Sequence, residues 1–125
     1  MRTWIAVAAL FGLIAVALGA FGAHGLKERA SAEQLAWLDT ATRYAMWHAL
    51  ALLGVAALGE IAAGGAPAAT LRLAAWSFAF GIVVFSGSLA TMALGAPRWL
   101  GAVTPIGGAG FLLGWASLAV HALWR

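Results

Sequence analysis

The feature that most constrains this chain is a series of four long apolar runs that hold almost no charge. They cover about residues 4–24, 44–63, 71–95 and 102–124. A helix needs about 20 such residues to cross a hydrocarbon core of about 30 Å. In lipid only helices and closed barrels satisfy their own backbone groups, and these runs are continuous rather than alternating. The sequence therefore predicts an all-α integral membrane protein, a bundle of four transmembrane helices forming a single domain over residues 1–125.

The composition excludes the soluble alternatives. Hydrophobic residues make up 64% of the chain and charged residues 9%, whereas about a quarter of an ordinary soluble domain is charged. The seven basic residues stand singly between the apolar runs, so membrane lipid is the expected partner and nucleic acid is not. The absence of cysteine excludes disulfides and thiolate metal sites.

A polar segment at 31–43 separates the first two runs. Ser31 followed by Gln34 fits a capping box at a helix start. Leu35, Leu38 and Thr42 then fall on one face. We expect a short amphipathic helix that lies in the membrane interface and leads into the second span. Turns are predicted at residues 64–67 and 95–97, where glycine precedes proline.

Four spans place both termini on one side of the membrane, here called side A, together with the connection between the second and third spans. The other two connections then lie on side B. Positive charges are nearly balanced between the sides, so the positive-inside rule favours side B as cytoplasmic only slightly. Tryptophans gather toward both boundaries, as expected of interfacial belts, except Trp115 near mid-membrane. Trp99 is expected to anchor side B, and Arg43 and Trp47 are predicted to form a cation–π anchor there.

Small residues at helical spacing indicate how the helices pack. Lipid gives no hydrophobic drive for helix pairing, so close backbone approach is needed. The glycines expected at helix contacts are Gly12, Gly19, Gly87, Gly107, Gly108, Gly110 and Gly114. They predict a tightly packed bundle and self-association into a homo-oligomer.

The polar side chains inside the spans concentrate in the half toward side B. They are His24, Tyr44, His48, Ser86, Ser88, Thr91 and Thr104. Counting along the second span places His48 about 7 Å from mid-membrane. One interpretation is that these groups hydrogen-bond to one another or to backbone carbonyls and hold the bundle together. The other is a binding site for a small-molecule ligand of unknown identity, because ionisable residues inside a span often carry function.

Templates for catalysis are missing from the sequence. It holds no phosphate-binding glycine loop, no zinc-binding pair of histidines and no paired carboxylates within the spans. A serine–histidine–acid set would need Ser86 or Ser88 beside His48, with Asp39 too far toward the interface. We therefore predict that the protein is not an enzyme and has no catalytic residues, metal or cofactor.

Four motifs carry a resemblance over nearly the whole chain. They are GAFGAHGL at 19–26, TATRYAMWHALALL at 40–53, FSGSL at 85–89, and TPIGG at 104–108 with Gly114 and Trp115. The chain resembles the small membrane proteins grouped as domain of unknown function 423, to which eukaryotic transmembrane protein 256 is similar. The resemblance implies a bacterial inner-membrane protein with four spans and no settled activity. Ala90 departs from relatives that carry an aromatic residue there.

Three functions stay open at this point. The first is a non-enzymatic oligomeric scaffold or accessory protein. The second is a conduit or binding site for a proton, ion or small solute around His48, since histidine changes its charge near neutral pH. The third is a cofactor-binding membrane protein using His24 and His48, for example as ligands of a haem.

Overall fold

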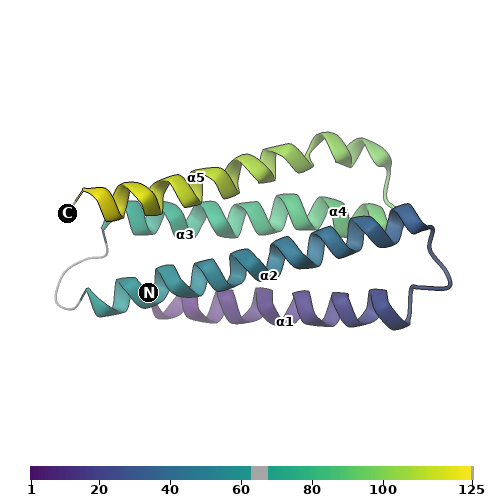
Figure 1. Cartoon of the computed structure of the whole chain (residues 1–125), viewed down its shortest axis with the longest axis horizontal. Coiled ribbons are helices and arrows are strands. Elements are labelled where there is room, and N and C mark those ends of the chain that lie inside the picture. The colour runs from purple at the N-terminus through teal and green to yellow at the C-terminus, as the bar shows by residue number, and fades with distance from the viewer. Residues whose placement is uncertain (63–67, 125) are drawn as a thin grey trace.

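The computed structural model describes residues 1–62 and 68–124, and this part of the chain is folded into helices without strands (Figure 1). Four helical stretches are long and apolar enough to cross a membrane. They are Arg2–His24, Ala32–Ile61, Ala69–Ala93 and Arg98–Leu123. The predicted fold class, an all-α bundle of four spans, is confirmed.

The first two spans are α1 (Arg2–His24) and α2 (Ala32–Ile61). The predicted capping box opens α2: the Gln34 backbone N–H donates to Ser31 Oγ at 3.1 Å, and the Ser31 backbone N–H donates to Gln34 Oε1 at 2.9 Å. The helix then runs for 30 residues without a break, a rise of about 45 Å. Segment 31–43 is thus the first part of α2, and the structure contains no separate interfacial helix there. The predicted end of this span at residue 63 and the turn at 64–67 lie outside the described residues.

The third span has three parts. It begins with α3 (Ala69–Gly81), continues through a π-helical turn, η1 (Ile82–Ser86), and ends with α4 (Gly87–Ala93). The hydropathy pattern predicts one regular helix here and gives no sign of the π turn. After α4 the chain turns at Gly95, whose φ of +106° is a left-handed conformation that favours glycine.

The last span follows a short 3₁₀ helix, η2 (Arg98–Ala102), and consists of α5 (Thr104–Leu123). Pro105 lies in the first turn of α5, where its missing N–H removes no helical hydrogen bond and its fixed φ suits the helix. The sequence TPIGG at 104–108 therefore starts the helix and places two glycines in its first turns.

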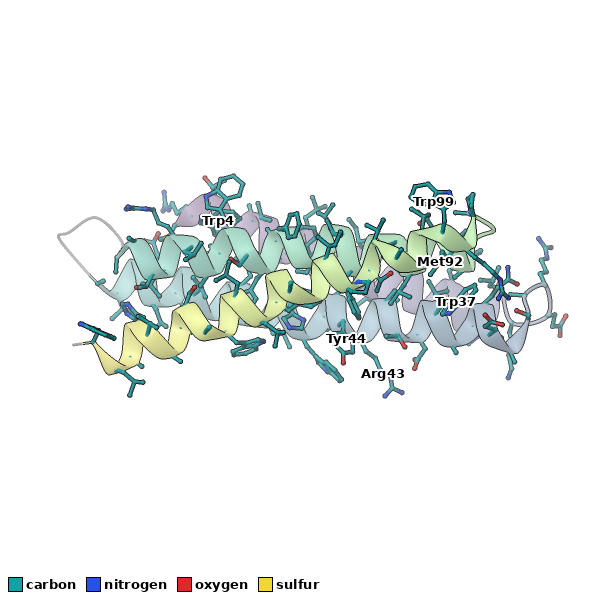
Figure 2. The ribbon with its side chains drawn as sticks, turned by 90° about the horizontal axis from the view of Figure 1, so that it is seen from above. Trp4, Trp37, Arg43, Tyr44, Met92 and Trp99 are labelled. Atoms are coloured by element: carbon teal, nitrogen blue, oxygen red, sulfur yellow. The ribbon has the colours of Figure 1, made fainter. Side chains whose placement is uncertain are left out.

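The four spans are arranged around α2 and α3. Helix α1 packs along α2, the third span packs along both α2 and α5, and α5 also contacts η1 (Figure 1). The N-terminus and the end of α5 lie at the same end of the bundle in Figure 1. Figure 2 shows Trp4 toward that end and both Trp37 and Trp99 toward the other, which is the distribution expected of two aromatic belts.

The glycines of α5 face the third span closely. A Cβ added to Gly107 would collide with the backbone of Phe85, and one added to Gly110 would lie 3.2 Å from the Ser77 carbonyl oxygen. A Cβ on Gly114 would collide with the ring of Phe78. At these three positions α5 can approach the third span closely only because glycine has no side chain.

The other predicted packing glycines are less crowded. Added Cβ atoms on Gly12 and Gly19 would lie 4.0 Å from side-chain atoms of Met46 and Thr42, across the contact between α1 and α2. A Cβ on Gly108 would lie 3.8 Å from the ring of Phe85, and one on Gly87 would meet nothing within 4 Å. Gly87 therefore makes no tight helix contact.

Candidate functional site

His48 lies on α2 with 6% of its surface exposed and with both ring nitrogens bonded. The indole Nε1–H of Trp115 on α5 donates to His48 Nε2 at 3.2 Å. Because an indole nitrogen is only a donor, Nε2 is the acceptor and Nδ1 carries the proton of the neutral ring. Nδ1 lies 2.7 Å from the Tyr44 carbonyl oxygen, to which it donates. The neutral imidazole therefore has its donor and its acceptor satisfied within the bundle.

Aromatic rings enclose the imidazole. Phe111 of α5 stacks on it with ring centroids 3.6 Å apart and planes 10° apart. Tyr44 lies one turn before His48 on α2 with its ring at 5.9 Å, and Phe78 of α3 lies at 5.7 Å. Trp115 crosses Phe78 edge-on at 5.2 Å. Three spans thus contribute rings to one cluster around a single polar side chain.

Ser88 and Thr104 form a second polar contact, between α4 and the start of α5. Their hydroxyl oxygens lie 2.6 Å apart. Ser88 also lies 2.9 Å from the Phe85 carbonyl oxygen, and Thr104 lies 3.3 Å from that of Leu100. This pair ties the third span to the fourth near side B.

The hydroxyl of Thr91 is hydrogen-bonded, whereas that of Ser86 is not. Thr91 donates to backbone carbonyls one turn earlier, to Gly87 at 2.8 Å and Ser88 at 3.0 Å. Ser86 is 6% exposed, and its Oγ has no hydrogen-bond partner in the part of the chain that the structure describes. A buried polar group without a partner costs about 1–3 kcal/mol. Ser86 lies at the end of the π turn, a helix distortion that is frequent at functional sites.

The seven polar residues predicted as one cluster are thus divided by the structure. Tyr44 and His48 lie together, and so do Ser88 and Thr104. Thr91 bonds to the Ser88 carbonyl oxygen rather than to either hydroxyl of that pair, and Ser86 bonds to neither group. His24 is exposed at the end of α1. The end of α1 that carries His24 packs at the level of Leu38 on α2, because Gly22 lies against Leu38. Leu38 comes ten residues before His48 on α2, which corresponds to a rise of about 15 Å. His24 and His48 are therefore far apart.

The arrangement offers few chemical options at His48. Its nitrogens already bond Tyr44 and Trp115, so neither one activates the hydroxyl of Ser86 or Ser88. Among the residues that the structure describes, no group of three or more His, Cys, Asp and Glu side chains is placed to hold a metal ion.

The charged anchors on side B differ from the prediction. Arg43 Nε lies 3.0 Å from Asp39 Oδ2, one turn earlier on α2, and the Trp47 ring packs on Tyr44 at 5.0 Å. In the described part of the chain the cation–π contact joins Arg98 to Trp37, with the guanidinium carbon 5.5 Å from the ring centroid. The predicted Arg43–Trp47 contact is wrong, because the Arg43 guanidinium forms an ion pair with the carboxylate of Asp39 instead.

Arg98 also forms an ion pair between the start of the fourth span and α2. Its Nη2 lies 3.1 Å from Glu33 Oε2. Both side chains are exposed, so the ion pair itself contributes little stability. Trp99, predicted as an anchor, is 66% exposed beside this contact, which places an indole ring where lipid headgroups are expected.

Sequence reasoning missed the two residues that complete the site, Phe111 and Trp115. Both lie on α5, one turn apart and interleaved with Gly110 and Gly114. The available signal was the depth of Trp115. A tryptophan in the middle of a span is away from the interfacial belts, and its N–H needs a partner there.

The fold, with its four apolar spans and few buried polar groups, defines a small integral membrane protein. The chain belongs to the family described as protein of unknown function (DUF423), whose family model matches residues 18–108. The similarity to eukaryotic transmembrane protein 256 stays a prediction.

Relatives over nearly the whole length are bacterial membrane proteins. The chain is 44% identical to the UPF0382 membrane protein of Staphylococcus saprophyticus, over 96% of each chain. It is 40% identical to the UPF0382 membrane protein YwdK of Bacillus subtilis, over 98% of each chain. It is also 40% identical to the UPF0382 inner membrane protein YgdD of Escherichia coli, over 98% of this chain and 90% of the relative. None of these names states an enzymatic activity, and no solved structure matches the chain significantly.

Proposed function

We propose that the protein is a non-enzymatic scaffold or accessory protein that acts as a homo-oligomer in the inner membrane of a bacterium, with both termini on side A. The observation that carries this proposal is the use of the polar side chains. His48, Ser88, Thr91 and Thr104 all bond within the bundle. The bonds of His48 and of the Ser88–Thr104 pair join different spans, and side chains bonded in this way have little capacity left for a reaction.

Gly54 supports the oligomer and suggests its contact face. This residue lies inside α2 and is exposed, and a Cβ added to it would have no neighbour within 4 Å among the described residues. Glycine weakens a helix by about 0.5–1 kcal/mol relative to alanine, and no close approach of another described helix requires glycine at this position. In membrane helices such glycines commonly lie at helix–helix interfaces. The exposed face around it also carries Leu50 and Leu58, against which a second copy would pack.

The oligomer can be tested by native mass spectrometry of the protein purified in mild detergent. We expect the wild-type protein to release assemblies of at least two copies, and Gly54→Leu to shift them toward the monomer. Ala116→Leu is the matched control, because it makes the same kind of change on the exposed face of α5 and should leave the assembly intact. A wild-type protein that is monomeric at every detergent concentration would refute the oligomer.

The conduit around His48 is the weaker alternative. It would require the ring to release Trp115 or Tyr44 during transport, whereas both ring nitrogens lie within hydrogen-bond distance of these partners, at 3.2 Å and 2.7 Å. The two functions can be separated by a flux assay in proteoliposomes. We expect no proton or ion movement above that of empty liposomes, and a flux that disappears in His48→Ala would favour the conduit.

A further inference from the structure

A crevice lies between α1 and α2 at the end of the bundle where these two helices are connected (Figure 1). Its volume is about 320 Å³. One wall comes from the end of α1 and the connection that follows it, with Gly19, Gly22 and Lys27. The other wall is one face of α2, which includes Leu38 and Asp39. The lining therefore combines small, apolar and charged residues from two spans.

The crevice lies at the boundary between hydrocarbon and headgroups. With α1 (Arg2–His24) centred in the bilayer, Gly22 lies about 13.5 Å from the midplane, and the hydrocarbon ends about 15 Å from it. Leu38 packs at the level of Gly22, so Asp39, the next residue on α2, is also near this boundary. Lys27 follows the end of α1 and lies on the headgroup side of Gly22.

Two exposed side chains of opposite charge line the crevice without pairing with each other. In the described part of the chain, no ion pair joins Lys27 to Asp39, and the Lys27 ammonium has no other partner. Asp39 Oδ2 contacts Arg43 Nε at 3.0 Å. A carboxylate has about four acceptor sites, so Asp39 can accept further hydrogen bonds. The crevice thus presents a positive and a negative group, held apart, to whatever occupies it.

This arrangement restricts the chemistry of a ligand. The ligand must carry an anionic group for Lys27 and a cationic, hydrogen-donating group for Asp39, and it must have an apolar part for the wall at Leu38. A phospholipid with an ammonium headgroup has all three. The headgroup of phosphatidylglycerol has no positive charge, and the trimethylammonium group of phosphatidylcholine has no N–H to donate.

We infer that this crevice binds a phospholipid whose headgroup ends in a primary ammonium group, as in phosphatidylethanolamine. The Lys27 ammonium contacts the phosphate, and the Asp39 carboxylate accepts hydrogen bonds from the headgroup ammonium. The glycerol backbone and acyl chains extend past Gly19 toward the hydrocarbon. Both walls belong to one chain, so the site does not depend on the proposed oligomer.

The test is a competition among phospholipids with the same acyl chains, read by native mass spectrometry in mild detergent. The protein is mixed with equal amounts of dioleoyl phosphatidylethanolamine, phosphatidylglycerol and phosphatidylcholine. We expect the wild-type protein to retain one phosphatidylethanolamine per chain, with a preference of about tenfold over each of the others, which corresponds to about 1.4 kcal/mol. Lys27→Gln should weaken retention of all three, because it removes the partner of the phosphate.

Asp39→Asn tests the part of the inference that concerns the ammonium group. It removes the negative charge that selects this headgroup and releases Arg43 to contact phosphate. The preference should therefore change from phosphatidylethanolamine to phosphatidylglycerol, a reversal that loss of folding cannot produce. Asp39 and Arg43 are both exposed, so their ion pair contributes little stability and the variant should fold.

Two control variants make the same changes of charge outside the crevice. Glu33→Gln removes a carboxylate near the start of α2 that pairs with Arg98. Arg29→Gln removes an exposed positive charge from the connection that carries Lys27. Neither residue lines the crevice, so both variants should retain phosphatidylethanolamine as the wild-type protein does.

Several outcomes would overturn the inference. Equal retention of the three phospholipids by the wild-type protein would remove the selectivity. A preference that is unchanged in Asp39→Asn, or lost equally in Glu33→Gln, would place the headgroup elsewhere. Displacement of the lipid by soluble glycerophosphoethanolamine would assign the site to a soluble phosphoester. The spectra report copy number and bound mass separately, so this inference and the proposed oligomer can fail independently.

Discussion

His48 and Trp115 satisfy each other's polar atoms in a region otherwise filled by hydrocarbon rings. Trp115→Phe would keep an aromatic ring against Phe78 and remove the N–H that donates to His48 Nε2. We expect a loss of about 1 kcal/mol of unfolding free energy, within the range for polar contacts between membrane helices. The measurement is unfolding of the detergent-solubilised protein with increasing SDS. Trp99→Phe changes a 66% exposed indole and should leave the midpoint unchanged.

A double-mutant cycle isolates this contact. His48→Phe and the double variant with Trp115→Phe complete the cycle, and residues in direct contact typically couple by at least about 0.5 kcal/mol. We expect the double variant to be more stable than the sum of the two single losses implies, because it leaves no unpaired polar atom. Additive losses would mean that the hydrogen bond contributes nothing to stability.

Single residues also show where the sequence stops being informative. Tyr44 and His48 are one turn apart, so their shared face follows from helical spacing alone. Trp115 is 67 residues away from His48, and no spacing rule connects them. Spacing also could not identify the partner of Arg43. Trp47 and Asp39 are both one turn away from it, and only the side-chain geometry shows that the partner is Asp39.

At the scale of helices, alanine substitutions at the two neighbouring glycines of α5 should change stability in opposite directions. An alanine Cβ at Gly107 would collide with the Phe85 backbone, whereas one at Gly108 would lie 3.8 Å from the Phe85 ring, an ordinary contact. Gly107→Ala should therefore cost about 1–3 kcal/mol, as overpacking does. Gly108→Ala should be neutral or stabilising by up to about 1 kcal/mol, because alanine favours the helix. The same SDS unfolding measurement compares the two variants.

Equal effects of Gly107→Ala and Gly108→Ala would contradict this packing of α5. The two variants are matched in sequence, chemistry and helix position, so they differ only in what the new methyl group meets. A similar loss in both would mean that the helix start tolerates alanine poorly. A similar gain in both would mean that α5 does not press on Phe85.

The elements themselves were predictable to different degrees. Hydropathy located all four spans, because crossing hydrocarbon depends on length and composition rather than on tertiary contacts. The capping box located the start of α2 for the same local reason. The π turn was not predictable: it spans Ile82–Ser86, where the backbone of Phe85 meets Gly107. Its position coincides with a tertiary contact, and the local sequence around it reads as ordinary helix.

At the scale of the whole molecule, α1 lies at the edge of the arrangement. It buries only Ala8 and Ala15, and its exposed large residues include Leu10, Leu13 and Val16. In water so much exposed apolar surface would promote aggregation. In a bilayer the same surface faces lipid tails at no such cost, and small residues suffice to hold α1 against α2. The low burial of α1 is thus consistent with a membrane protein and inconsistent with a soluble one.

The path of the chain across the membrane can be tested because the protein has no cysteine of its own. Single cysteines at Thr3, Glu28 and Pro97 would each be exposed. Four spans place Thr3 on side A, and Glu28 and Pro97 together on side B. In intact cells a membrane-impermeant maleimide should label either Thr3→Cys alone or both of the other variants. The slight preference of the positive-inside rule for a cytoplasmic side B favours labelling of Thr3→Cys. Disagreement between Glu28→Cys and Pro97→Cys would contradict the four-span arrangement, because two spans separate these positions and bring the chain back to the same side.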